Sequence, residues 1–565
     1  MNTNFYNKSR EFYLQQFDLL DIIKGLEENF SSKHSFDNQK EAYQYYEMVL
    51  KNAGDICANF IWPRSEEVDI HGATINDGIV SWAPGTQENM KILGDAGYLG
   101  GTLPRKYGGL NLPITINNII VEMVSQADAS LMNQFGLQDI AVTVYKFGTE
   151  EQKNRVLPKF CKGEVSGSMA LTEPEAGSDL QAVQLKALNI ESNWYLDGVK
   201  RFITNGNGEV SLVLARSEKG SKGGRGLSMF LYERYRDNNL IVRRIEDKHG
   251  IHGSPTCELQ FNMAKCELVG QRKFGLIKYV MSLMNGARLA VSAQALGIAQ
   301  AAYEEAVKYA NEREQFGKPI VHIPAIYQML KNMQSEIETS RILLYKTSLA
   351  VDYFDMYERK EDAGEKVKQE LKSAKAKADF LTPLSKFVLT EMANDVTYDA
   401  VQIHGGCGYM KDFPVERLSR DARITNIYEG TTQLQVVAAI AGIKADVVRE
   451  DFAGFKNIEA NKHINEHKQI VDYIDTYYTL LKKVKQECNK ELFEYISNYI
   501  VEMVSIIYRL VLLMPIAEKH SEKDEIFKYY LMKSNSKLIY LNQVISDTIE
   551  QYNEQTESLK TDFVR

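Results

Sequence analysis

Residues 168–179 read Ser168-Met-Ala-Leu-Thr-Glu-Pro-Glu-Ala-Gly-Ser-Asp179, a short apolar run that is closed by a turn. The run predicts a strand that ends at Thr172, whose hydroxyl and backbone can meet the edge of a ligand. Pro-Glu-Ala-Gly then predicts a turn that leaves Ser178 and Asp179 at the mouth of a site. The alternative is an ordinary strand and turn in which a Ser or Asp side chain caps the next segment.

Around this stretch the hydrophobic pattern has a period of two. The pattern is clearest in 211–215, 229–232 and 257–261, and Asp197-Gly198 and Asn205-Gly-Asn-Gly208 supply turns. We therefore expect a central antiparallel β-domain over residues 165–270.

Helical patterns flank this β-domain on both sides. Residues 1–164 are helical in rhythm, and after Gly270 the apolar residues Leu289, Ala293 and Leu296 again fall on one helical stripe. We expect a second helical domain over 271–445 and, because apolar periodicity resumes at Ile470, an additional helical domain over 446–565. The predicted fold class is α+β, and the charged stretch 357–377 is interpreted as a solvated helix–helix excursion.

Composition excludes several classes of protein. The 565 residues are 44% hydrophobic and 25% charged, which fits a globular chain of several structural units. With 67 Lys and Arg against 75 Asp and Glu, the net charge is −8 and no basic block marks a nucleic-acid partner. The six scattered cysteines form no C-x-x-C pair, so we expect no zinc site and no disulfide framework.

Targeting and membrane signals are weak. The first residues show no leader pattern, and we expect a cytoplasmic protein. Residues 500–517 are apolar enough to consider a membrane span, but Glu502, Arg509 and Pro515 interrupt them. We expect a buried bundle helix there and no membrane partner.

Three further motifs are interpreted structurally. The glycine-rich segment 94–109 predicts helix caps and turns rather than a phosphate cradle, because no alternating strand precedes it and no Lys-Ser/Thr follows a glycine. Segment 220–226 predicts an exposed hairpin loop. His463-Ile-Asn-Glu-His467 fits the H-x-x-E-H pattern of zinc peptidases, but it lies in a polar stretch without an apolar shell. It predicts a solvated helix start.

A second chemical segment reads Arg423-Ile-Thr-Asn-Ile-Tyr-Glu-Gly-Thr-Thr-Gln433. It places Glu429 between Tyr428 and Gly430, where burial would raise the pKa of the carboxyl toward the value that a general base needs. The alternative is a glutamate at a helix entry that the helix dipole stabilises.

These two segments resemble motifs of the flavin-dependent acyl-CoA dehydrogenases. The other three matching motifs, in the family's order, are Phe202-Ile-Thr-Asn-Gly206, Arg313-Glu-Gln-Phe-Gly-Lys318 and Gln402-Ile-His-Gly-Gly406. The resemblance runs from about Gly97 to about Lys444. It extends in outline to the longer bacterial members, which carry an additional C-terminal helical domain and act on compounds such as 3-methylmercaptopropionyl-CoA. It implies an N-terminal helical domain, a central β-domain and a C-terminal four-helix bundle.

The resemblance implies FAD as the cofactor. The residues that it assigns to FAD are Met169, Leu171, Thr172, Ser178, Phe202, Ile203, Thr204, Arg313, Phe316, Gln402, Gly405, Gly406, Thr431 and Gln433. Phe202 stands where the family has tryptophan, and Ile323-Pro324 replaces a His-Gln pair whose glutamine touches flavin. In this family some FAD contacts cross a subunit boundary, which implies a homo-oligomer, a dimer first and a tetramer as the alternative.

The resemblance also implies the reaction. Glu429 matches the catalytic base, since the family's other base position is occupied here by Ala287. The residues assigned to the acyl-CoA substrate are Ser178, Arg288 and Gly430. The implied activity is α,β-dehydrogenation of an acyl-CoA to a trans-2-enoyl-CoA, with electrons passed to an electron-transfer flavoprotein. The alternatives are an acyl-CoA oxidase and a flavin-bearing, nucleic-acid-binding relative; the acyl group is not specified.

Overall fold

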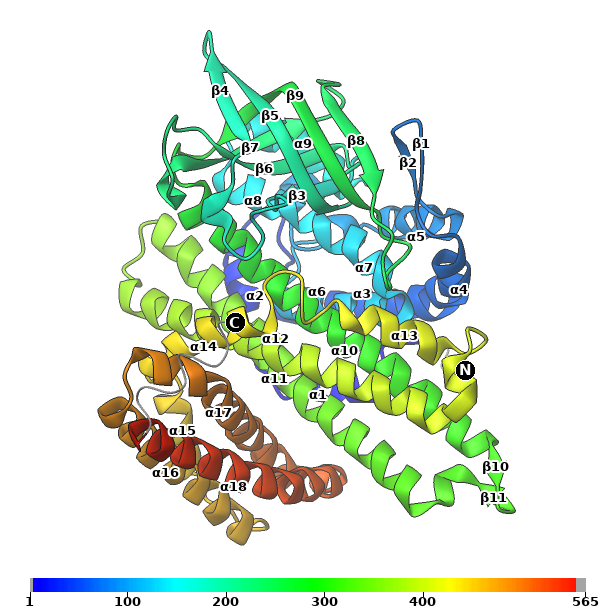
Figure 1. Cartoon of the computed structure of the whole chain (residues 1–565), viewed down its shortest axis with the longest axis vertical. Coiled ribbons are helices and arrows are strands. Elements are labelled where there is room, and N and C mark those ends of the chain that lie inside the picture. The colour runs from blue at the N-terminus through cyan, green and yellow to red at the C-terminus, as the bar shows by residue number, and fades with distance from the viewer. Residues whose placement is uncertain (1–3, 555–565) are drawn as a thin grey trace. The chain divides into compact units, whose positions relative to one another are not determined.

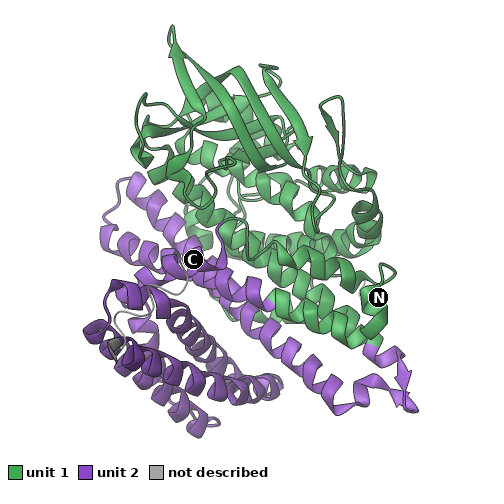
Figure 2. Ribbon diagram, in the orientation of Figure 1, with its two compact units in different colours: residues 1–309, 393–429 green, residues 310–392, 430–565 purple. Residues whose placement is uncertain are grey.

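The computed structural model describes residues 4–554, which fall into two compact units (Figure 2). Unit 1 comprises residues 1–309 and 393–429, and unit 2 comprises residues 310–392 and 430–565. Helices α10 (Met281–Glu312) and α12 (Lys368–His404) each continue from one unit into the other. The boundaries of the four predicted segments stay predictions.

Unit 1 begins with helices, as the sequence predicts. They are α1 (Lys8–Leu14), α2 (Leu20–Leu26), α3 (Gln39–Ile56), α4 (Trp62–His71), α5 (Pro84–Asp95), α6 (Ile114–Ala127), α7 (Ala129–Gly136), α8 (Ile140–Phe147) and α9 (Glu150–Cys161). An unpredicted hairpin, β1 (Thr74–Asn76) and β2 (Ile79–Ser81), interrupts them. Its turn is Asp77-Gly78, where both residues have positive φ, as a tight hairpin turn requires.

The central sheet has seven strands and, through its pairings, closes on itself (Figure 1). They are β3 (Gly167–Ala170), β4 (Lys186–Ile190), β5 (Asn193–Thr204), β6 (Val210–Arg216), β7 (Leu227–Glu233), β8 (Leu240–Ile245) and β9 (Thr256–Val269). Most pairs are antiparallel, but β3 and one bridge of β4 run parallel to β6. The predicted antiparallel β-domain therefore also contains a parallel pairing, which the long connection from β3 to β6 permits.

The two faces of strand β6 pack against two different buried hydrophobic clusters. Val210, Leu212 and Leu214 pack in one buried cluster with side chains of α8 and α9. Val213 and Ala215 point to the other face, into the cluster enclosed by the strands. Successive side chains of a strand alternate between faces, so a strand covered on both sides is apolar throughout. Its partner β7 is likewise buried at every position.

The remaining elements follow α10. They are a small hairpin of β10 (Glu314–Gln315) and β11 (Lys318–Pro319), followed by α11 (Pro324–Asp362), α12, α13 (Pro414–Arg423), α14 (Thr432–Lys444), α15 (Arg449–Lys456), α16 (Ile464–Glu487), α17 (Lys490–Lys519) and α18 (Asp524–Glu554). The charged stretch 357–377 forms the end of α11, a turn and the exposed start of α12. The order helices, sheet, helices confirms the α+β prediction.

Within unit 2, helices α14 and α16–α18 pack together, and α17 and α18 also pack on α11. Among the described residues, α17 alone is long and apolar enough to cross a membrane, and 83% of its apolar window is buried. The prediction of a buried helix over 500–517 is confirmed. The stretch after Val448 is less linker-like than its composition indicates, because it forms α15 with Phe452 and Phe455 buried.

Candidate active site

The first candidate segment lies at the end of β3. Leu171 is buried and Thr172 is partly exposed, and Met169 lies on β3 itself. The Thr172 carbonyl accepts a hydrogen bond from the Arg201 N–H at 3.0 Å. No residue in the described part of the chain accepts a hydrogen bond from the Thr172 N–H or hydroxyl. Two donors are therefore available at this strand end.

Strand β5 brings the Phe202 motif to the same place. Its register with β9 shifts between Lys200 and Ile203, so that Arg201 and Phe202 form a bulge. Phe202 has φ +59° and remains 51% exposed, with the Arg201 guanidinium 4.7 Å from its ring centroid. Ile203 is buried and Thr204 partly buried. The Arg201–Thr172 hydrogen bond thus joins two predicted motifs that are distant in sequence.

Glu429 lies in a turn between α13 and α14. Its φ is +54° and its side chain is partly buried. Helix α14 starts at Thr432 with Thr431 as its N-cap, so Glu429 lies outside the first helical turn. The helix-entry alternative loses support, because the dipole acts on charges within that turn.

Tyr428 anchors this turn to two helices of unit 1. Its hydroxyl donates to Gln294 Oε1 on α10 and lies 3.3 Å from Asn133 Oδ1 on α7. Burial raises the pKa of Tyr428, and the adjacent Glu429 raises it further. The phenol is therefore neutral at physiological pH. The sequence did not indicate Asn133 and Gln294, because a polar residue within a buried helix gives no local sign of which distant residue it bonds to.

Gly430, the first residue after Glu429, belongs to unit 2 and is held there by two hydrogen bonds. The Gly430 carbonyl accepts hydrogen bonds from Lys386 Nζ at 2.8 Å and from Gln435 Nε2 at 2.7 Å. Thr431 is partly exposed and Gln433 is exposed. Arg313 is exposed at the base of the β10–β11 hairpin, and Phe316 in its turn has φ +55° and is 91% exposed.

The other predicted residues belong to unit 1. Ser178 is exposed, and Asp179 beside it accepts a hydrogen bond from the Gln181 N–H. Arg288 is buried on α10 and donates to Asn285 Oδ1 at 3.3 Å. Gln402, Gly405 and Gly406 are exposed at the end of α12. None of these hydrogen bonds joins Arg288, Ser178 and Gln402 to one another.

Several of these features fit a flavin. Thr172 offers two donors for the polar edge of a ring, and Phe202 offers a partly exposed aromatic wall. A Cβ added at Gly405 or Gly406 would meet no atom within 4 Å, which leaves room for a bulky group to approach the backbone.

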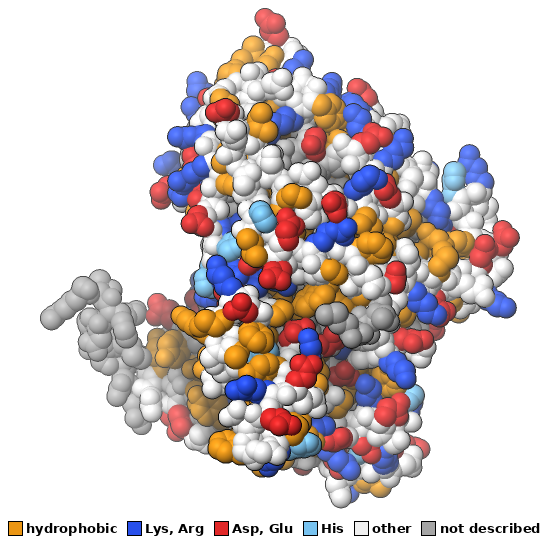
Figure 3. Space-filling view, turned by 90° about the vertical axis from the view of Figure 1, so that its right-hand side faces the viewer, with side chains coloured by type: hydrophobic (Ala, Val, Ile, Leu, Met, Phe, Trp, Pro, Cys, Tyr) orange, Lys and Arg blue, Asp and Glu red, His pale blue; other side chains and the backbone are white. Residues whose placement is uncertain are grey.

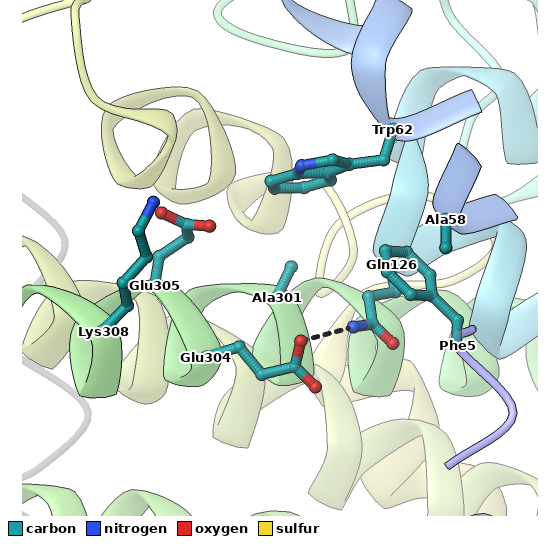
Figure 4. Close-up of a pocket in the computed structure, with 8 residues that line it drawn as sticks. All are labelled: Phe5, Ala58, Trp62, Gln126, Ala301, Glu304, Glu305 and Lys308. Carbon is teal, nitrogen blue, oxygen red and sulfur yellow. Dashed lines mark hydrogen bonds between the residues drawn. The ribbon is translucent and has the colours of Figure 1, made fainter. Parts of the chain in front are cut away.

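A cavity of about 280 Å³ in unit 1 is separate from these residues (Figure 4). The Trp62 ring covers it, and Gln126 donates to Glu304 at 3.1 Å along one side. Its lining is Phe5, Ala58, Trp62, Gln126, Ala301, Glu304, Glu305 and Lys308. No predicted site residue contributes to it.

The histidines of the H-x-x-E-H motif serve the fold. His463 is buried with Nε2 3.2 Å from Asp524 Oδ1, and His467 Nε2 bonds to the Phe455 carbonyl at 3.0 Å. Burial of His463 contradicts a wholly solvated helix start. Within residues 4–554, no group of three or more His, Cys, Asp or Glu is placed to hold a metal ion.

Comparison with known proteins identifies the architecture. The N-terminal, middle and C-terminal domain models of acyl-CoA dehydrogenases match residues 44–164, 168–264 and 277–443. The chain belongs to the acyl-CoA dehydrogenase family. Membership makes it an oxidoreductase that acts on CH–CH bonds, with FAD as its cofactor.

Two relatives and one solved structure illustrate the range of the family. The 3-methylmercaptopropionyl-CoA dehydrogenase of Ruegeria pomeroyi is 34% identical over 434 residues, which cover 70% of this chain and 71% of that protein. The 3-(aryl)acrylate reductase of Clostridium sporogenes is 33% identical over 397 residues, which cover 69% of this chain and 96% of that protein.

An acyl-CoA dehydrogenase from Bacillus anthracis, solved in complex with FAD, has a TM-score of 0.76 at 24% identity. That structure aligns with 93% of this chain and 90% of its own, so its fold also extends over the C-terminal helices.

Proposed function

We propose that this protein is an FAD-dependent acyl-CoA dehydrogenase in which Glu429 is the catalytic base. The observation that carries the proposal is the placement of Glu429. It is a partly buried carboxylate on a turn with positive φ, and Tyr428 fixes that turn between α7 and α10. A carboxylate removes an α-proton from a thioester only when it is oriented and shielded from water, and this anchoring orients it.

The residues of the chain divide the remaining tasks. Thr172, Phe202 and the two glycines that directly follow α12, Gly405 and Gly406, hold FAD, while Ser178, Arg288 and Gly430 contact the acyl-CoA. When bound, FAD accepts the hydride that leaves the β-carbon. Glu429 takes the α-proton, and the electron pair of that C–H bond forms the double bond of a trans-2-enoyl-CoA. Two electrons then pass to an electron-transfer flavoprotein.

The proposal includes the protein's surroundings. It is a cytoplasmic homo-oligomer with no nucleic-acid or membrane partner. A dimer is the favoured assembly, and a tetramer is the alternative. The 91% exposed Phe316 and the 79% exposed Tyr409 support an oligomer, since large aromatic side chains are rarely left in water unless a partner covers them. Sedimentation velocity of the FAD-loaded chain measures its size directly.

Glu429→Gln tests the catalytic assignment. The variant keeps the shape of the side chain but cannot take a proton, so FAD should remain bound while acyl-CoA no longer bleaches it under anaerobic conditions. General-base removal costs a factor of roughly 10² to 10⁴ in rate. Glu450→Gln is the matched control, because Glu450 is an exposed glutamate in the first turn of α15. Flavin bleaching by Glu429→Gln at the wild-type rate would refute the assignment.

A panel of short, medium, aryl and methylthio acyl-CoAs with a dye acceptor identifies the substrate. The reductase name of one relative supports a second candidate direction, reduction of a 2-enoyl thioester at the same site. Assaying the matching aryl enoyl-CoAs with reduced dye distinguishes the two directions. Hydrogen peroxide formed in air would indicate an oxidase.

A further inference from the structure

Directly behind the flavin-contacting strand end lies a buried ion pair. Lys200 on β5 is fully buried, and its ammonium donates to Glu173 Oε1 at 2.8 Å. The same ammonium donates to the Leu171 carbonyl at 2.6 Å. Lys200 therefore binds the residues immediately before and after Thr172.

Glu173 is anchored on its other side as well. Its carboxylate accepts hydrogen bonds from the Gln184 N–H at 2.7 Å and the Leu185 N–H at 3.0 Å. Its backbone pairs with Ala176 across the turn that leads to Ser178. The side chain thus joins the turn, the two residues just before β4 and strand β5.

The pair is poorly explained by stability alone. Removing two charges from water costs several kcal/mol per ion, and a well-packed apolar pair of similar volume is often as stable. Burial lowers the pKa of Lys200 to about 8, although Glu173 opposes that change. A costly pair at this position is better explained by the geometry that it imposes.

That geometry concerns Thr172 and Phe202. With Leu171 and Glu173 tied to one ammonium and the Thr172 carbonyl tied to the Arg201 N–H, the backbone around Thr172 has little freedom. The Thr172 N–H and hydroxyl are the groups left to face a ligand. Lys200 also immediately precedes the bulge that exposes Phe202, so one side chain links both candidate flavin contacts.

We propose that Lys200 and Glu173 are positioning residues that fix Thr172 and Phe202 in the arrangement that receives the flavin ring. This inference rests on the proposed function. It assigns neither residue a contact with substrate or cofactor. Its consequence is that the pair controls FAD affinity and the electronic environment of the flavin.

The test uses the full-length, FAD-loaded protein and the double variant Lys200→Met/Glu173→Gln. The double variant leaves no unpaired buried charge, so it should fold. We expect FAD to bind roughly 10- to 100-fold more weakly, as when a supporting residue behind a ligand is lost, with a shifted visible flavin spectrum and midpoint potential. Lys200→Met alone should weaken FAD binding further than the double variant does, because it leaves the buried Glu173 carboxylate charged and without its cation.

The matched control is Arg155→Met. Arg155 on α9 forms ion pairs with Glu233 and Glu267, both at 2.7 Å, and touches neither Thr172 nor Phe202. It should lower the melting temperature without moving the flavin spectrum. A double variant that shows the same behaviour as this control would overturn the proposal.

FAD affinity and spectrum are read without acyl-CoA, which keeps the two proposals distinguishable. A wild-type chain that binds FAD but dehydrogenates no acyl-CoA contradicts the proposed function and leaves the positioning test intact. A wild-type chain that does not bind FAD overturns both.

Discussion

Thr172 is the proposed FAD contact that can be tested most directly. Thr172→Val exchanges a hydroxyl donor for a methyl group of similar volume. One lost hydrogen bond to a buried acceptor costs about 1 to 3 kcal/mol. We therefore expect weaker FAD binding and a changed midpoint potential, measured by flavin fluorescence on release and by redox titration.

Thr397→Val is the control for this change. The Thr397 hydroxyl is buried on α12 and donates to the Ala393 carbonyl at 2.9 Å, away from β3. Its loss should affect stability alone. If Thr172→Val retained wild-type flavin content and potential, the flavin edge would have to lie elsewhere.

At single residues, the sequence indicates candidate ligand-facing groups but not the groups that support them. Thr172 and Glu429 stand in short motifs, so their roles can be proposed from local order. Lys200 and Glu173 are separated by strands β4 and part of β5, and only the fold shows that they meet. Long-range pairing of charges leaves no local pattern, which is why the sequence could not reveal it.

Elements were predictable where one hydrophobic period dominates. Strand β9 and helices α10 and α17 follow from such periods, whereas β6 and β7 are short runs of mostly apolar residues that are buried on both faces. The β1–β2 hairpin was missed because its strands are three residues long, although Asp77-Gly78 is a hairpin signal. The parallel pairing of β3 was missed because alternation reports a strand but not its partner.

The contact between α11 and α17 predicts a pH dependence. Glu336 on α11 accepts hydrogen bonds from Arg509 at 2.7 Å and from Lys533 at 3.0 Å. Burial raises the pKa of Glu336, but the two cations outweigh it and hold the pKa at about 2. Since the unfolded value is 4.5, this carboxylate stabilises the fold above pH 4.5, and the stabilisation is lost as the pH falls toward 2.

Glu336→Gln should therefore be destabilised at pH 7, by roughly 3 kcal/mol. Its deficit relative to wild type should shrink as both are unfolded by denaturant at pH values from 5 down to 2.5. Glu525→Gln is the control, because its ion pair with Lys331 is 70% exposed on the glutamate side and should contribute little. A deficit of equal size at pH 7 and pH 2.5 would contradict the prediction.

In the whole molecule, the segments outside the family domains are tied to them by charge. Arg10, which precedes the matched region, forms a fully buried ion pair with Glu122 on α6 at 2.9 Å. Arg509 and Lys523, which follow it, pair with Glu336 and Glu338 on α11 at 2.7 and 2.9 Å. Each of these two segments therefore supplies a cation to a glutamate on a helix of the family domains.

The surface charge is consistent with this picture. On the face shown in Figure 3, Lys and Arg side chains are interspersed with Asp and Glu. With a net charge of −8, such a surface favours solubility over long-range attraction to a polyanion. The ion pairs that connect the terminal segments to the family domains are the buried ones described above.

Removal of the C-terminal helices tests how far the family domains depend on them. A chain truncated before Asp451 loses Arg509 and Lys523, which leaves Glu336 and Glu338 without these cations and uncovers the faces of α11 and α14 on which α17 packs. Exposed apolar patches of that kind cause association, so we expect insoluble protein or a changed oligomeric state, measured by solubility and sedimentation. The full-length variant Arg509→Met/Glu336→Gln removes the ion pairs of Glu336 with Arg509 and Lys533 and keeps the apolar cover, and it should stay soluble with FAD bound. A truncated chain that is soluble, FAD-loaded and as active as the full-length protein would show that the C-terminal helices are dispensable.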